Sequence, residues 1–291
     1  MKHHKSLRLL AGAALVAAAA SAQSAVIYSI ADSGRSLIRF DSATPGAVSV
    51  VGAFSGATVR MDGMDFRPAD GLLYGFNQAT SGIYRIDTTT GATTLVSTSS
   101  TASTTGNMGV DFNPVPDRLR LVNTDDQNLR INVATGGATV DGALAYAAAD
   151  VNAGANPNVI DVAYTNHDRN PATGTTLYYI DTLLDILATT AAPNAGVLNT
   201  VGALGVDTDR FTGFDISTDA GINTAYASFT SNGTPSLYTI NLATGAATLV
   251  GAINGSLLYG LAVAPIPEPG SLALLALGGI GIWAQRRRRA G

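Results

Sequence analysis

A four-strand unit repeats along the chain, and this repeat restricts the fold more than any other feature of the sequence. Each unit contains an apolar-alternating strand that ends in Asp or Asn, a turn with a Gly, and a second strand that closes on Val-Gly or a similar pair. The copies are spaced by 46, 46, 55 and 53 residues at the aligned positions Leu37, Ile83, Leu129, Leu184 and Leu237. Five units result.

Two further strands precede this pair in most units, as in residues 63–68 with 72–77. Four strands at a period of about 48 residues are typical of a β-propeller blade. The first unit lacks an inner strand, whereas residues 258–263 form an inner strand that no blade follows. Joining the two ends completes a blade and removes two open sheet edges. We predict an all-β, five-bladed β-propeller over residues 23–264, closed between the N- and C-terminal strands. A β-sandwich or a β-solenoid remains the alternative.

The first 22 residues are typical of a signal peptide. Lys2, Lys5 and Arg8 precede the apolar residues 9–20, and Ala20-Ser21-Ala22 forms a small-residue cleavage site. We predict cleavage after Ala22, with Ala25 as the alternative site. The remaining chain is therefore expected to be exported across the inner membrane.

Residues 265–291 combine a Pro-Glu-Pro box, an apolar stretch at 272–284 and a basic end. The box is Pro267, Glu268 and Pro269, and the basic end is Arg286, Arg287, Arg288 and Arg289. The order of these parts resembles the PEP-CTERM sorting signal of Gram-negative bacteria, which implies an exosortase-type processing enzyme as a partner. Thirteen apolar residues span only about 20 Å as a helix, short of the roughly 30 Å hydrocarbon core. We expect a short transmembrane helix that anchors the protein transiently in the inner membrane, before release to the cell envelope, outer surface or extracellular space.

The charge of the body excludes several function classes. Between the two terminal segments the chain has ten arginines, no lysine, twenty aspartates and no glutamate. A surface of this balance argues against nucleic acid as a partner, because phosphate binding needs positive charge. The chain has no cysteine, so disulfides and thiolate metal sites are impossible.

Metal and cofactor chemistry also has little support in the sequence. His3 and His4 leave with the signal peptide, and His167 is expected to be an ordinary solvated loop residue. A zinc site would need further nitrogen ligands. We therefore predict no metal-ligating residues and no cofactor, although calcium is plausible for an Asp-rich exported protein.

The sequence favours a binding protein over an enzyme. Glycosidases are known on five-bladed propellers, and their chemistry needs two carboxyl groups, one of them held protonated. In such enzymes the acid is usually Glu, which the body lacks, and most of its aspartates are expected to stabilise turns. We predict a non-catalytic protein, with a glycosidase-like, carbohydrate-active enzyme as the alternative.

One blade concentrates polar side chains that are able to bind an acidic sugar or another carboxylate. These predicted ligand-binding residues are Arg118, Arg120, Asn123, Gln127, Asn128 and Arg130. Arginine pairs bidentately with a carboxylate, and amides bind sugar hydroxyls. The alternative is that the same residues cap turns and pair with aspartates between blades.

Several phrases of the body resemble one known family. They include Asp111-Phe112-Asn113-Pro114, Leu144-Ala145-Tyr146-Ala147-Ala148 and Leu198-Asn199-Thr200-Val201-Gly202. They look like the domain of unknown function 4394, a family of secreted, propeller-like bacterial proteins that frequently carry the same sorting tail. The resemblance implies no reaction. With the sorting tail, it implies a structural or binding role in an exopolysaccharide or biofilm setting, with extracellular polysaccharide as a partner.

Overall fold

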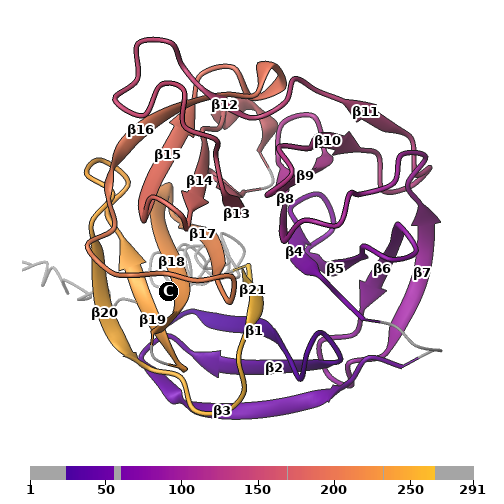
Figure 1. The fold of residues 1–291 in the computed structure, drawn as a ribbon. Helices are drawn as coiled ribbons and strands as arrows, with labels where there is room; N and C mark the ends of the chain where they lie inside the picture. Colours follow the sequence, from indigo (N-terminus) through magenta and orange to yellow (C-terminus); the bar gives the residue numbers. More distant parts are fainter. Residues whose placement is uncertain (1–23, 56–59, 169, 232, 266–291) are drawn as a thin grey trace, which may run out of the picture.

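Five small sheets surround a central axis in the computed structural model, which describes residues 24–55, 60–168, 170–231 and 233–265 (Figure 1). The described residues contain strands and two short 3-10 turns, η1 (Pro171–Thr173) and η2 (Pro193–Ala195). The predicted five-bladed β-propeller is confirmed. The predicted signal peptide and the sorting residues Pro267, Glu268, Pro269 and Arg286 to Arg289 lie outside the described residues.

Four blades are built from consecutive strands, and each runs outward from an innermost strand. The second blade is β4 (Gly63–Arg67), β5 (Leu72–Asn77), β6 (Gly82–Ile86) and β7 (Thr93–Thr98). The third blade is β8 (Met108–Asn113), β9 (Arg118–Asn123), β10 (Asn128–Ile131) and β11 (Ala138–Val140). The fourth blade is β13 (Val159–Tyr164), β14 (Leu177–Asp181), β15 (Ile186–Thr190) and β16 (Val197–Ala203). The fifth blade is β17 (Gly213–Asp219), β18 (Ile222–Ser231), β19 (Thr234–Ile240) and β20 (Ala247–Ala252).

The first blade takes strands from both ends of the body. Its inner strand is β21 (Tyr259–Val263), followed outward by β1 (Val26–Ala31), β2 (Ser36–Asp41) and β3 (Thr44–Ala53). β21 pairs antiparallel with β1, and Ile27 lies opposite Val263. The predicted closure between the termini is confirmed. Ala25 is buried and its N–H donates to Ser42 Oγ, a contact that cleavage after Ala22 preserves and cleavage after Ala25 removes.

The fourth blade carries an additional strand that the sequence did not predict. β12 (Ala145–Tyr146) pairs parallel with β16 at the outer edge of this blade. It belongs to the long connection between β11 and β13, which lengthens the repeat at this point. The aligned position in the fourth unit is Leu187 and not Leu184, because Leu187 lies opposite Gly202 as Leu37 lies opposite Gly52. A two-residue strand has too few positions to show an alternating pattern.

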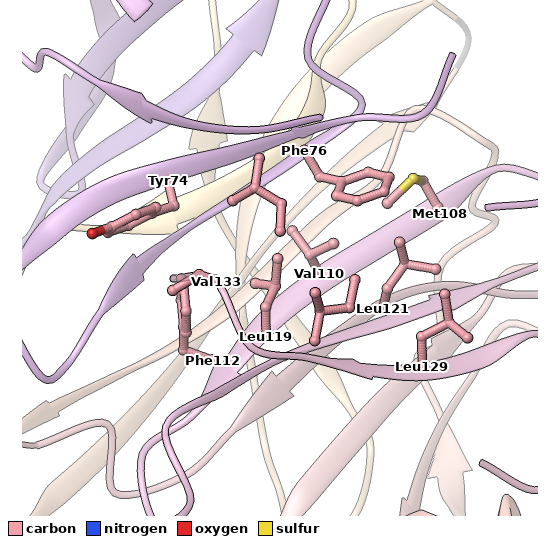
Figure 2. Close-up of a cluster of buried hydrophobic side chains, with 11 residues drawn as sticks. Tyr74, Phe76, Met108, Val110, Phe112, Leu119, Leu121, Leu129 and Val133 are labelled. Carbon is pink, nitrogen blue, oxygen red and sulfur yellow. The ribbon is translucent and has the colours of Figure 1, made fainter. Parts of the chain in front are cut away.

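Apolar side chains fill the spaces between neighbouring blades. Figure 2 shows one such cluster, in which Tyr74 and Phe76 of β5 pack against Met108, Val110 and Phe112 of β8. Tyr74 and Phe112 meet edge to face, with ring centroids 5.5 Å apart. Fully burying a side chain such as Phe112 contributes roughly 1.5–3 kcal/mol. Packing between blades, more than hydrogen bonding within one sheet, therefore joins the five units.

The inner strands approach each other so closely that some positions require glycine. A Cβ atom added at Gly109 would lie 2.1 Å from Asp161 Oδ1 and 2.5 Å from Asp161 Cα on β13. Because the second of these atoms is backbone, a side chain at Gly109 would force β8 and β13 apart. Glycine near the start of β8 thus lets the inner strands approach closely around the axis of the propeller, the central channel.

Candidate functional site

A pocket of about 760 Å³ opens at the end of the channel where the five inner strands begin. Its walls include Met108, Ile160, Thr212 and Tyr259, at or beside the start of β8, β13, β17 and β21. The remaining lining residues come from the connections between blades and from the β5–β6 turn. Ligand pockets in proteins commonly have volumes of about 300–1,000 Å³. This pocket is therefore large enough for a small ligand or a short stretch of polymer.

Two arginines give the pocket positive charge: Arg60 precedes β4, and Arg210 precedes β17. Arg60 pairs with Asp62, with Nε 2.6 Å from Oδ1, and its side chain remains 52% exposed. Arg210 lies over the ring of Phe211, 4.7 Å from the centroid. Phe211 in turn meets Tyr259 edge to face at 5.2 Å. The rim thus places exposed guanidinium groups beside an aromatic pair.

Hydrogen bonds hold the loop of residues 101–107 as one wall of the pocket. Gln78 Nε2 donates to the carbonyl oxygens of Thr104 (2.6 Å) and Gly106 (2.8 Å). From the other side, Asn123 Nδ2 donates to Thr104 Oγ1 at 2.7 Å, and Gln127 Oε1 accepts from the Thr104 N–H at 3.0 Å. The loop is therefore fastened to both the second and the third blade, so its polar groups are held in place.

The predicted ligand-binding residues divide between the interior and two faces of the propeller. Asn123 and Gln127 support the pocket wall from behind. Arg120 and Asn128 are buried, and Arg120 donates to Tyr164 Oη, Asn128 Oδ1, Asp141 Oδ2 and Asn194 Oδ1. The bonds to Tyr164 and Asn194 join the third blade to the fourth. They agree with the alternative stated for these residues, in which they cap turns and pair between blades.

Arg118 and Arg130 lie nearer the opposite end of the blade. Arg118 donates to the carbonyl oxygens of Pro116 and Asp117 within its own turn. Arg130 forms a bidentate pair with Asp141 and also lines a second pocket, of about 560 Å³, beside Tyr164 and Asn194. The structure does not gather the six predicted residues at one pocket, and a ligand bound by them stays a prediction.

Sequence reasoning missed the two arginines of the large pocket, although the repeat contains a pattern that identifies them. Arg60 and Arg210 each stand three residues before the glycine that begins an inner strand, Gly63 and Gly213. Aligning the units on that glycine places both arginines at the same blade position. The loops before the inner strands carry this pattern, whereas the alternation of apolar residues is confined to the strands.

Many aspartates accept turn N–H groups, as expected, but four lie inside the inner strands. Asp65, Asp111, Asp161 and Asp215 are each no more than 4% exposed. Asp65 accepts from the N–H of Phe66 (2.6 Å) and, across the blade boundary, of Phe112 (2.7 Å). Asp161 and Asp215 bridge to the next inner strand in the same way, and Asp111 accepts from the Tyr164 N–H. The carboxylates therefore link the inner strands in series, from β4 through β8, β13 and β17 to β21.

The fifth inner strand has no carboxylate at this position. Val263 donates its N–H to Asp215 just as Phe112 donates to Asp65, so Ala262 stands where Asp111 stands in β8. His167, from the connection after β13, faces the carboxylates of the other strands. Its Nε2 lies 3.3 Å from Asp65 Oδ2, and its side chain is 6% exposed. The expectation that His167 is a solvated loop residue is wrong, because the β13–β14 connection is bound to Thr218 and places the imidazole against Asp65.

Burial and mutual repulsion change the ionisation of the channel groups. Burial raises the pKa of Asp111 well above its ordinary value, and the charges of Asp65 and Asp215 raise it further. Burial, followed by the charge of Asp65, raises the pKa of Asp215 to about 7. Burial lowers the pKa of His167, but the carboxylates of Asp65, Asp215 and Asp168 together outweigh this effect, so the pKa of His167 is raised overall. The channel thus shares protons among several carboxyl groups and one imidazole.

Known proteins resemble the chain in fold and in its terminal motif. A structural genomics protein of unknown function from Bacteroides thetaiotaomicron VPI-5482 superposes with a TM-score of 0.50, at 15% identity over 84% of this chain and 68% of that chain. A nidogen/laminin complex has a chain with a TM-score of 0.47, at 11% identity over 83% of this chain and 98% of its own. At such identities the likeness concerns the fold alone. None of the curated proteins matches the sequence significantly.

Two family models match the chain, one over its C-terminal segment and one over the propeller. Residues 265–289 match the PEP-CTERM protein-sorting motif, which implies export and association with the envelope or surface. Among the described residues, no helix is long and apolar enough to span a membrane. The expected transmembrane helix falls outside these residues. Residues 36–262, nearly the whole propeller, match the model of a domain of unknown function, and the chain therefore belongs to the DUF4394 family.

Proposed function

We propose that the protein is a non-catalytic binding propeller of the cell envelope or extracellular matrix, and that its large pocket binds an acidic polysaccharide. The observation that carries this proposal is the pair of arginines, Arg60 and Arg210, at equivalent blade positions on the rim of one pocket. The sorting motif supports it, because an exported chain processed by an exosortase-type enzyme meets the polymers outside the inner membrane.

The chemistry of the pocket suits a uronic acid residue. A guanidinium group pairs with a carboxylate through two parallel hydrogen bonds, and Arg210 is exposed for such a contact. Asn77, Gln78 and Thr80 offer amide and hydroxyl groups on one wall. Tyr259, beside Phe211, offers an aromatic edge to the apolar face of a sugar ring. Charge, hydrogen bonding and apolar contact therefore converge on one opening.

The distribution of carboxylates favours binding over hydrolysis. Glycoside hydrolysis needs two carboxyl groups that flank the scissile bond. Among the described residues that line the pocket, Asp62 is the one carboxylate, and it pairs with Arg60. The four channel aspartates are buried and bonded to backbone N–H groups. These contacts support a non-catalytic role.

The test measures binding of alginate oligomers, which consist of uronic acids, and of neutral dextran to the wild-type protein. Charge-assisted hydrogen bonds contribute about 1.5–3 kcal/mol each, so Arg60→Gln and Arg210→Gln should each weaken alginate binding by about tenfold or more. The exposed Arg39 on β2 provides the matched control, because Arg39→Gln removes the same charge far from the pocket. Equal binding by all three variants, or equal binding of dextran, would contradict the proposal. Release of shortened oligomers would instead favour the enzyme.

A further inference from the structure

His167 presents a buried nitrogen that lacks a hydrogen-bond partner. Within the part of the chain that the structure describes, Nε2 accepts or donates no hydrogen bond, although its side chain is 94% buried. Asp65 Oδ2 lies 3.3 Å away without the alignment that a hydrogen bond requires. Buried polar atoms without a partner are uncommon, and each calls for a physical explanation. The backbone holds the residue in place, because its N–H donates to Thr218 Oγ1 at 2.8 Å.

Two carboxylates that are able to bind a metal ion lie close to this nitrogen. Asp65, Asp111 and His167 each contribute one potential ligand atom, and these three atoms lie within 4.8 Å of one another. At metal–ligand distances of about 2.1 Å, two neighbouring ligands are separated by roughly 3.0–3.4 Å in octahedral or tetrahedral geometry. The 3.3 Å between Nε2 and Asp65 Oδ2 falls in this range. The two atoms are thus misaligned for a hydrogen bond but suitably spaced for two ligands of one cation.

We infer that Asp65, Asp111 and His167 bind one divalent transition-metal cation, Zn²⁺ or Mn²⁺, in the central channel. Imidazole nitrogen suits zinc and related metals, and carboxylate oxygen suits manganese as well as calcium. Calcium prefers six to eight oxygen ligands, so a set with one nitrogen argues for the transition metals. This site is separate from the polysaccharide pocket, and neither proposal depends on the other.

The architecture explains why a cation would bind at this position. Three blades contribute, since Asp65 lies on β4, Asp111 on β8 and His167 after β13. The backbone N–H groups of Phe112 and Tyr164 already orient the two carboxylates, in the way that outer-sphere contacts orient metal ligands. A bound cation would also neutralise a channel that holds Asp161 and Asp215 in addition. It would therefore join three blades at the axis.

The test uses protein purified from the exported fraction without an added histidine tag. After treatment with EDTA, the protein is titrated separately with Zn²⁺, Mn²⁺, Ca²⁺ and Mg²⁺, and bound metal is counted by elemental analysis. We expect one Zn²⁺ or Mn²⁺ per chain and a melting temperature that rises on binding. His167→Gln and Asp111→Asn should weaken binding by more than about 100-fold, because loss of outer-sphere partners alone costs about 10- to 100-fold.

Two further measurements keep the inference testable if a variant folds poorly. Asp207→Asn removes an exposed carboxylate on the β16–β17 connection and should leave binding unchanged. In the wild-type protein, Co²⁺ should produce a visible absorption spectrum that Zn²⁺ abolishes by competition. Absence of stoichiometric binding to the wild type would overturn the inference. Binding of Ca²⁺ alone, or Zn²⁺ binding that His167→Gln leaves intact, would overturn it equally.

Discussion

At the scale of single residues, buried polar side chains connect neighbouring blades. Arg120 is 1% exposed and donates to groups from the third and the fourth blade, including Tyr164 Oη at 3.0 Å and Asn194 Oδ1 at 2.8 Å. Its pairing with Asp141 keeps both charges compensated inside the protein. Arg130 also pairs with Asp141, so loss of Arg120 would mainly leave the buried oxygens of its other acceptors without a donor, which costs about 1–3 kcal/mol each.

Replacement of Arg120 by Met should therefore lower the free energy of unfolding by about 3 kcal/mol or more, because Asn128, Asn194 and Tyr164 each lose a donor. Urea denaturation measures this loss. Arg118→Gln is the matched control, since Arg118 is partly exposed and bonds only within its own turn. We expect the control to change stability by about 0.5 kcal/mol or less. Equal losses for both variants would show that Arg120 is not an interblade tie.

Gly109 offers a second residue-scale test, of the close approach between inner strands. Gly109→Ala should lower the free energy of unfolding by about 1–3 kcal/mol, because the added methyl group overlaps backbone atoms of Asp161. Gly137→Ala is the control, since the atom nearest to its added Cβ is Thr135 Oγ1 at 3.3 Å. Urea denaturation of both variants provides the comparison. A Gly109→Ala protein as stable as the control would contradict the packing described for β8 and β13.

At the scale of elements, β21 closes the ring. It lies between β1 of its own sheet and the neighbouring inner strands, and its Val263 N–H donates to Asp215 of the fifth blade. The approach to β21 and the strand itself also bury the apolar side chains of Leu258, Leu261 and Val263. Without this strand, the inner edge of β1 would expose unpaired N–H and C=O groups.

Ending the chain at residue 257 should accordingly lower the melting temperature by roughly 10 °C or more. Burial of three large apolar side chains contributes at least about 5 kcal/mol, and in a chain of this size each kcal/mol corresponds to about 2–4 °C. Calorimetry on the two truncated proteins measures the effect. A chain ending at residue 265 keeps β21 and should melt as the parent does. If both truncations melted alike, closure by β21 would not stabilise the propeller.

At the scale of the whole molecule, five strands that meet at one axis concentrate charge. Asp111, Asp161 and Asp215 all have a raised pKa, with burial as the first cause. Between about pH 4 and 7, the folded protein therefore binds more protons than the unfolded chain. Stability must then fall as pH rises through this window. The raised pKa of His167 acts in the same direction, since its contribution is lost above its folded pKa.

For protein freed of divalent cations, we expect the urea midpoint to decrease steadily from pH 5 to pH 8. Asp215→Asn should show a shallower decrease, because it removes the carboxyl group whose pKa is about 7. The comparison concerns the slope, since the variant also loses an acceptor for the Val263 N–H and starts from a lower stability. A midpoint that rises with pH would contradict the assignment of raised pKa values to the channel.

The repeat alone was enough to predict the propeller, its five blades and its closure. The predicted strand at residues 72–77 coincides with β5, and the predicted inner strand at residues 258–263 contains β21. Alternation of apolar residues is a local pattern, so these elements could be read without knowledge of their neighbours. The resemblance to the family and to the sorting motif rests on local phrases of the same kind.

The two sites depended on the tertiary structure. Arg60 and Arg210 are 150 residues apart, and His167 lies 102 residues after Asp65. Only the closed propeller brings the two arginines to one pocket, and only the closed propeller brings His167 next to Asp65. The burial of His167 likewise follows from where a single connection places its side chain, which no pattern in the sequence expresses. Strands form from local alternation, but a site at a propeller axis exists only once all five blades surround it.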